Sequence, residues 1–307
     1  MRHTFAELLD LAAAESGGLD AQTRPAVVKE LLHYDILMAL SESEIAPHVV
    51  FQGGTALRLC YGGSRFSEDL DFVCGTDISE PFLLESMNAI LVKQIQERYG
   101  LATEIHPPGA DKSFDDDGIT VKRWRYHIQV PGFAAAQKIH VEFCNVPAYD
   151  ASPVLLQPRY GFLADRYGGI VLQAESESEI LADKMVALAG RPYLKARDIW
   201  DIRWLMQRGH QVDIDLVRLK ASDYGIEDVS TKLDTAVKRL RDPSTGRAFV
   251  SEMQRFVSPS LAAAMLREDP PGRSWLEHAA KTATNAARTL YEAPAIDSAP
   301  SADNHEP

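Results

Sequence analysis

The stretch FQGGTALRLCYGGSRFSEDLDF, residues 51–72, decides the fold of this chain. Residues 48–51 form a short apolar run that predicts a strand, and this strand ends at Gly53-Gly54. Thr55 is typical of the residue that caps a helix, and the helix that it would cap is brief. Residues 70–73 alternate apolar and polar side chains, which predicts a second strand. The predicted order is therefore strand, glycine turn, helix, strand.

The second strand brings two carboxylates together. Residues two apart on a strand project to the same face, so Asp69 and Asp71 would lie side by side while Leu70 and Phe72 enter the core. Two adjacent carboxylates repel each other unless a cation lies between them. Mg²⁺, with Mn²⁺ as the alternative, prefers such oxygen ligands. The pair therefore predicts a divalent-metal site.

The glycine turn is suited to bind phosphate. A turn that leads into a helix exposes backbone N–H groups to an anion, so Gly53 and Gly54 are candidates for nucleotide binding. The hydroxyls of Thr55 and Ser67 add donors, and Arg65 beside the turn adds a positive charge. Taken alone, however, an Asp-x-Asp pair can lie on a solvated strand face, and Gly-Gly-Thr can be only a turn with its cap.

A third carboxylate is available further along the chain. Residues 119–130 and 137–146 both alternate polar and apolar residues, as two neighbouring half-buried strands would. In the second of them Lys138, His140 and Glu142 share one face. Phosphoryl transfer with two metal ions needs carboxylates close together, which makes Glu142 the candidate third metal ligand. A surface strand with three polar residues would have the same pattern.

A second group of candidate residues lies in a helical part of the chain. The run EILADKMVAL, residues 179–188, has helical periodicity and places Lys184 at the border of its apolar face. The ammonium group of Lys184 could meet the phosphates of a nucleotide, and Asp198 would fix it or act as a base. The alternative is a structural network of surface ion pairs, including an Arg197–Asp201 pair one helical turn apart.

The chain divides into two parts of different character. Short strands mix with helices up to about residue 170, whereas the following segment is helical, so we expect an α+β fold with domains at residues 1–170 and 171–290. Residues 291–307 have no apolar face and predict a disordered tail. Residues 184–248 hold 13 basic and 9 acidic residues, so this part is the more suitable one to face a nucleic acid.

Composition narrows the class of protein. The chain has 307 residues, 45% of them hydrophobic, and a net charge of −12, which argues against non-specific coating of nucleic acid. Its three cysteines have no CxxC spacing, and its nine histidines include no HExxH or His-x-His pattern, so no zinc site is predicted. Because we also find no leader and no run of about 18 apolar residues, we expect a cytoplasmic protein that does not enter a membrane.

These motifs resemble a known family. The glycine and Ser-Glu-Asp-Leu-Asp block, followed by EILADKMVALAGR (residues 179–191) and KARDIWDI (residues 195–202), resembles the AbiEii/MenT nucleotidyltransferase-like toxins of type IV toxin–antitoxin systems. That family belongs to the DNA polymerase β-type superfamily. The resemblance implies a nucleotidyltransferase core with a mixed sheet and a helical domain that completes the active site.

The resemblance also assigns roles to individual residues. By position it makes Ser67 and Asp69 the Ser-x-Asp of the nucleotidyltransferase signature and Asp71 the second acid. It makes Lys184 the residue that contacts the triphosphate and Asp198 the residue that supports it. In some members a kinase-like antitoxin phosphorylates the signature serine. Glu142 is not assigned by the resemblance.

The implied function is that of a toxin with a cognate antitoxin encoded nearby. Such a toxin uses Mg²⁺ and a nucleoside triphosphate (NTP) to transfer a nucleoside monophosphate to RNA, with the tRNA 3′ acceptor end as the target, and so blocks translation. Two other functions use the same residues: nucleotidyl transfer to a protein hydroxyl, and nucleotide binding without transfer. The absence of a Gly-Lys-Ser/Thr ending in the glycine stretch argues against a P-loop kinase or ATPase.

Overall fold

The computed structural model describes residues 3–16, 18–75, 81–109 and 119–292. Most of the expected tail, residues 293–307, lies outside this described part, and residues 291 and 292 end the last helix. No helix in the described ranges is both long and apolar enough to cross a membrane.

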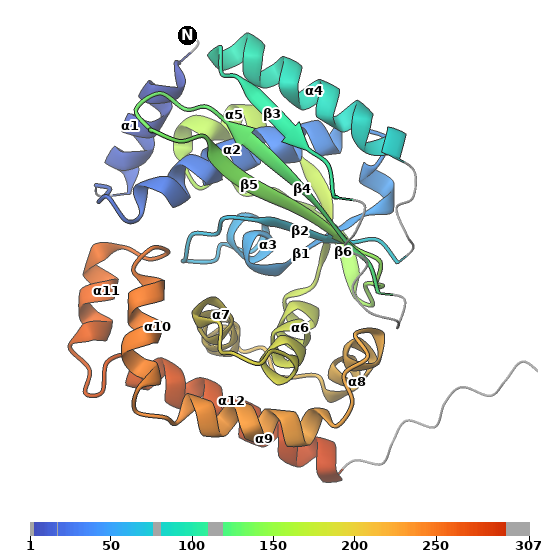
Figure 1. Cartoon of the computed structure of the whole chain (residues 1–307), viewed down its shortest axis with the longest axis vertical. Coiled ribbons are helices and arrows are strands. Elements are labelled where there is room, and N and C mark those ends of the chain that lie inside the picture. The colour runs from blue at the N-terminus through green and yellow to red at the C-terminus, as the bar shows by residue number, and fades with distance from the viewer. Residues whose placement is uncertain (1–2, 17, 76–80, 110–118, 293–307) are drawn as a thin grey trace, which may run out of the picture.

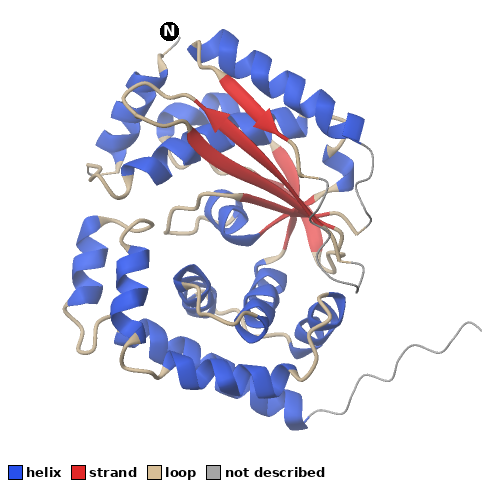
Figure 2. Cartoon of the chain, in the orientation of Figure 1, coloured by secondary structure: helices blue, strands red, loops and turns tan. Residues whose placement is uncertain are grey.

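One mixed sheet organises the first half of the molecule (Figures 1 and 2). Its described strands are β1 (Val50–Gln52), β2 (Leu70–Val73), β3 (Thr103–His106), β4 (Val121–Ile128), β5 (Gln137–Cys144), β6 (Ala151–Leu155) and β7 (Val171–Glu175). They lie in the order β3-β4-β5-β2-β1-β7-β6. β2 is antiparallel to β1 and parallel to β5. The two strands of the 51–72 stretch, β1 and β2, therefore lie at the centre of the sheet.

Helices cover one face of this sheet, as Figure 1 shows. They are α1 (Phe5–Glu15), α2 (Arg24–Ser41), α4 (Pro81–Tyr99) and α5 (Ala164–Tyr167), with two short 3-10 turns, η1 (Ala46–His48) and η2 (Gly161–Leu163). Beneath them, Phe51, Phe72 and Phe143 stack across β1, β2 and β5, with ring centroids 5.1 and 5.2 Å apart. Because alternate residues point to opposite faces, burial of these rings turns Asp71 and Glu142 to the other face.

The second half is helical and faces the uncovered side of the sheet centre (Figure 1). Its helices are α6 (Glu177–Gly190), α7 (Ala196–Gln207), α8 (Ile214–Asp223), α9 (Val229–Leu240), α10 (Thr245–Met253), α11 (Pro259–Leu266) and α12 (Arg273–Glu292). Fully buried Lys220 of α8 joins the halves: its Nζ lies 2.7 Å from Glu175 at the end of β7 and 2.7 Å from Glu179 of α6. The expected α+β fold with a helical half is confirmed.

Local details differ from the sequence expectations. His48 belongs to the 3-10 turn, and the strand expected over residues 48–51 is displaced to Val50–Gln52. The motif helix α3 (Gly53–Cys60) begins at Gly53, with Gln52 in the N-cap position, so Thr55 is not its cap. The sheet also continues beyond residue 170, because β7 pairs in parallel with β1 and antiparallel with β6.

Candidate active site

Three carboxylates meet at one cavity between the sheet and the helical half. Asp69 immediately precedes β2, Asp71 lies on β2, and Glu142 lies directly opposite Asp71 on β5. All three line a cavity of about 670 Å³. Sequence alternation predicted that each would leave the apolar face of its strand, and the parallel register of β2 and β5 brings the two strands' acids together.

The sheet side of the cavity, here called the sheet wall, carries Asp69, Asp71 and Glu142, and the pKa values of Asp69 and Asp71 are shifted in opposite directions. Burial and the charges of Glu142 and Asp69 raise the pKa of Asp71 to about 6. Burial opposes ionisation of Asp69 too, but the hydrogen bond and charge of His140, whose Nδ1 lies 3.2 Å from Asp69 Oδ1, lower the pKa of Asp69 to about 2. Burial is the larger cause of the raised pKa of Asp71, and the repulsion by the two neighbouring acids adds to it. An all-oxygen donor set of this kind fits a hard divalent cation.

The glycine turn lies at the edge of the same cavity. Gly53 has a φ of 75°, a conformation that favours glycine, and a Cβ there would lie 3.0 Å from Asp71 Oδ2. A Cβ on Gly54 would lie only 2.1 Å from the Arg65 guanidinium. Both glycines therefore allow a close approach of charged side chains, and the N-terminus of α3 opens onto the cavity beside them.

The two hydroxyl candidates have different surroundings. Ser67 is buried and lines the cavity beside Asp69. The hydroxyl of Thr55 instead donates a hydrogen bond to the backbone carbonyl of Asp69, and Thr55 is not among the residues that line the cavity. Thr55 therefore holds the backbone at Asp69, which corrects the expectation that its hydroxyl is available to a nucleotide.

Lys184 and Asp198 lie on the opposite, helical wall of the cavity. Lys184 Nζ of α6 donates to Asp198 Oδ1 of α7 at 2.9 Å and lies 3.2 Å from Asp201 Oδ2. Arg191 binds the second oxygen of Asp198. Burial disfavours ionisation of Asp198, but Lys184, Arg191 and Lys195 lower its pKa far below the ordinary range. Asp198 is thus placed to hold Lys184, whereas so firmly ionised a carboxylate is a poor base.

Arg65 is committed to the protein itself. Its guanidinium donates two hydrogen bonds of 2.6 Å to Asp201, and both side chains are almost completely buried. This pair ties the motif segment to α7 and orients the acid that also contacts Lys184. The Arg65 charge is already paired, but Arg65 also lines the cavity, so nucleotide binding by Arg65 stays a prediction. Asp201 faces Arg65 instead of forming a surface pair with Arg197.

Several cavity residues were not singled out as site residues in the sequence. His140, Arg123, Arg191, Lys195 and Arg197 all line the cavity. The pKa of Lys195 is lowered by burial and then by the charge of Arg197. The helical wall carries more cations than acids, because the cavity is lined there by Lys184, Arg191, Lys195 and Arg197 with Asp183 and Asp198. A signal existed for two of them, since Arg197 directly precedes Asp198 in the sequence and Lys195 lies three residues before it. The position of Arg191 depended on the turn between α6 and α7.

A wall rich in carboxylates thus faces a wall rich in cations. A nucleoside triphosphate with a metal ion supplies both charges, and a nucleotidyltransferase is the class of protein that this fold and cavity define. The chain belongs to the AbiEii family: the family model described as nucleotidyl transferase AbiEii toxin, type IV TA system, matches residues 35–279. It is therefore a toxin–antitoxin nucleotidyltransferase, with an NTP as substrate and an antitoxin as partner.

Two solved structures are similar to this chain. MenT4, a nucleotidyltransferase toxin from Mycobacterium tuberculosis H37Rv, is 19% identical, with a TM-score of 0.50 over 94% of this chain and 99% of that chain. JHP933 from Helicobacter pylori is 19% identical, with a TM-score of 0.49 over 90% of this chain and 96% of that chain. None of the curated proteins matches the chain.

Proposed function

We propose that this toxin transfers a nucleoside monophosphate from an NTP to the 3′ hydroxyl of a tRNA acceptor end and thereby blocks translation. One observation carries the proposal: the in-register acids Asp71 and Glu142 face the Lys184–Asp198 pair across a single cavity. A volume of about 670 Å³ lies in the usual range for a small-molecule site.

Each wall would have its own task. Asp69, Asp71 and Glu142 would hold Mg²⁺ or Mn²⁺, which supplies neutralising charge for the phosphates and for the departing pyrophosphate. On the other side of the nucleotide, Lys184 and the backbone N–H groups of Gly53 and Gly54 would bind the triphosphate, with Ser67 as a further donor. These contacts orient the α-phosphorus toward the acceptor.

The transfer is a displacement at the α-phosphorus. The acceptor 3′ oxygen forms a bond to that phosphorus while the bond to the oxygen bridging to the β-phosphate breaks, and pyrophosphate leaves with the electron pair. The hydroxyl proton passes to a carboxylate of the sheet wall. Asp198 acts as a positioning residue for Lys184.

An RNA acceptor needs basic side chains near the cavity that can contact its phosphates. Much of the basic surplus of the helical half is used internally, since Arg208 pairs with Glu177, Arg203 lies over the Trp275 ring, and Arg239 donates to the Arg191 carbonyl. Lys195 and Arg197, at the cavity itself, are the cations best placed to meet phosphates that approach the carboxylates.

A labelling assay tests the proposal. The protein is incubated with total tRNA, Mg²⁺ and each α-labelled NTP in turn, beside an Asp69→Asn variant. Transfer predicts labelled RNA with the wild type and at least about a 10³-fold lower rate with the variant. Glu68→Gln is the matched control, because the Glu68 carboxylate pairs with Lys29 and Arg255 and does not line the cavity.

The other outcomes separate the competing functions. If the label migrates with protein instead of RNA, the acceptor is a protein hydroxyl. Absence of label with all four NTPs, combined with saturable NTP binding, would overturn transfer and leave a nucleotide-binding protein.

A further inference from the structure

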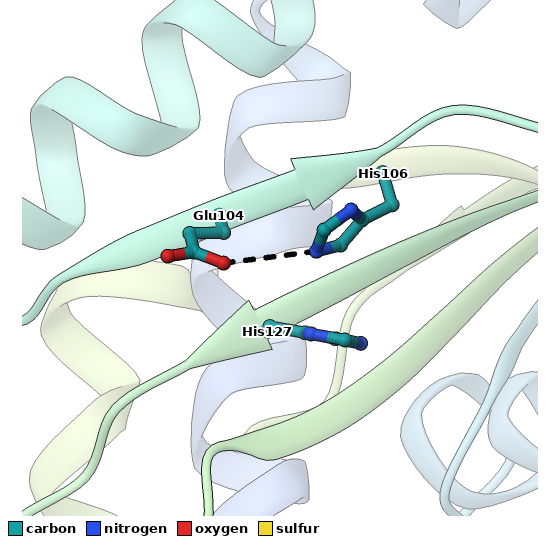
Figure 3. A group of neighbouring side chains, drawn as sticks. All are labelled: Glu104, His106 and His127. Atoms are coloured by element: carbon teal, nitrogen blue, oxygen red, sulfur yellow. Dashed lines mark ion pairs between the residues drawn. The ribbon is translucent and has the colours of Figure 1, made fainter.

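We propose that Glu104, His106 and His127 form a second metal site, specific for a transition-metal ion such as Zn²⁺, at the edge of the sheet. Figure 3 shows the three side chains on two neighbouring strands. The inference is independent of the nucleotidyl-transfer reaction, because none of these residues lines the catalytic cavity.

The register of the sheet explains how the three groups meet. Glu104 and His106 lie two apart on β3, which places them on one face of the strand. His127 on β4 is the direct cross-strand partner of Glu104. The local sequence did not indicate this site, because two ligands come from one strand and the third from the next.

The distances fit a metal ion after a small closure of the side chains. One ligand atom from each residue lies within 4.8 Å of the other two, so a point within about 2.8 Å of all three exists, against metal–ligand bonds of about 2.0–2.2 Å for Zn²⁺. His106 Nε2 and Glu104 Oε2 are 3.7 Å apart, close to the roughly 3.4 Å between two ligands of a tetrahedral zinc ion. The remaining coordination positions would face solvent, where water can fill them.

One nitrogen of the group has no hydrogen-bond partner among the described residues. His106 Nε2 is shielded from solvent, yet it forms no hydrogen bond within the described ranges, and its distance to Glu104 exceeds that of a hydrogen bond. The His106 and His127 rings lie 4.5 Å apart between centroids, so their nitrogens can converge. A bound metal ion would satisfy the His106 nitrogen, which is otherwise costly to leave unpaired.

The ligand chemistry separates this site from the catalytic one. Two imidazoles and a carboxylate suit Zn²⁺ and its neighbours in the transition series, whereas Mg²⁺ prefers oxygen ligands such as those of Asp71 and Glu142. His127 lies four positions along β4 from Arg123, which is opposite Glu142, and this corresponds to about 13 Å along the strand. The two sites therefore select different ions at different places on the same sheet.

The surroundings limit the affinity. Arg125, opposite His106, and Lys138, opposite His127, carry positive charge on the same face of the sheet, and both are exposed. Their repulsion is weakened by solvent but predicts micromolar rather than tighter binding. Bound there, the ion would link the edge strand β3 to β4.

Equilibrium dialysis of the full chain with Zn²⁺ at pH 7.5 tests the site. At this pH an ordinary imidazole is neutral and able to bind metal. We expect one bound equivalent in the wild type and at least tenfold weaker binding in both His106→Gln and His127→Gln. His48→Gln, which changes an exposed histidine on η1, and Asp69→Asn, which disables the carboxylate site, should retain the equivalent.

A second measurement controls for folding. Zn²⁺ should raise the unfolding temperature of the wild type and of His48→Gln but not of His127→Gln, while all three unfold at similar temperatures without the ion. If the equivalent is lost in Asp69→Asn and kept in His127→Gln, the ion occupies the carboxylate site and the proposal is wrong. Absence of bound Zn²⁺ in the wild type overturns it as well.

Discussion

The two walls of the cavity handle charge in opposite ways. On the sheet wall, Asp71 lies beside two other acids, and its pKa is raised to about 6 by burial and by their charges. On the helical wall Asp198 and Asp201 are paired with Lys184 and Arg65, and burial together with the charge of Arg197 lowers the pKa of Lys195 instead. The protein therefore keeps unbalanced negative charge on one wall and unbalanced positive charge on the other.

The difference indicates where free energy is stored for binding. A structure selected for stability alone would not keep close carboxylates without a cation, nor several cations around one carboxylate. Each wall becomes balanced when a metal–triphosphate complex binds between them. Substitutions that remove charge from either wall test this difference, and their expected effects on activity and stability differ in size and sign.

The largest effect is expected for Asp71→Asn. Loss of this acid should lower kcat/KM for nucleotidyl transfer at least about 10³-fold, because the developing charge on the phosphates loses a stabilising ion. The same change should stabilise the metal-free protein by about 1 to 3 kcal/mol at neutral pH, because it removes a carboxylate that the fold disfavours in its charged form.

The pH dependence of unfolding checks the sign of that second effect. Below pH 3.8, the ordinary pKa of Asp, the carboxyl is protonated in both states and costs nothing. Between that value and about 6 the folded protein keeps the proton while the unfolded chain loses it, so stability falls as pH rises. The gap between Asp71→Asn and wild type in denaturant melts should open across this window. If the difference in unfolding free energy between variant and wild type stayed constant with pH, or if the variant were less stable at pH 7.5, the charged Asp71 carboxylate would not destabilise the fold.

The next largest effect is expected on the helical wall, for Asp201→Ala. The Arg65 guanidinium would be left buried without its two hydrogen bonds, which should cost about 3 to 5 kcal/mol in the free energy of unfolding, measured by denaturant titration. Asp215→Ala, at an exposed acid of α8, is the matched control and should change stability by less than about 0.5 kcal/mol. An apolar pair, Arg65→Met with Asp201→Leu, should recover most of the loss. A double variant as unstable as the single one would contradict this account.

The sequence predicted the sheet wall better than the helical wall, for a physical reason. Alternation along a strand decides which face Asp71 and Glu142 occupy, and two apolar strands of matching pattern are natural neighbours. The Lys184–Asp198 contact could also be predicted from the sequence, because a short turn joins their two helices. These features depend on local periodicity.

Features that depend on distant partners were not predictable. Arg65 and Asp201 are 136 residues apart, and no local pattern distinguishes a guanidinium that binds a nucleotide from one that binds a buried acid. Gly54 could be assigned to a phosphate-binding turn, but its close contact with Arg65 required the packed structure. The Thr55 hydroxyl likewise fits a helix cap until the Asp69 carbonyl is found beside it.

The smallest effect, and the sharpest test of the contrast, is expected for Lys195→Met. The wild-type side chain is half-buried among other cations, and its pKa is lowered, so its charge is costly unless an anion binds. Its removal should raise the KM for the NTP by about tenfold, the value of one charge-assisted hydrogen bond, while the unfolding midpoint stays the same or rises. Lys238→Met, on an exposed position of α9, should leave both quantities unchanged. A rise in the KM for RNA with an unaltered KM for the NTP would instead assign Lys195 to the acceptor and leave Lys184 to bind the triphosphate.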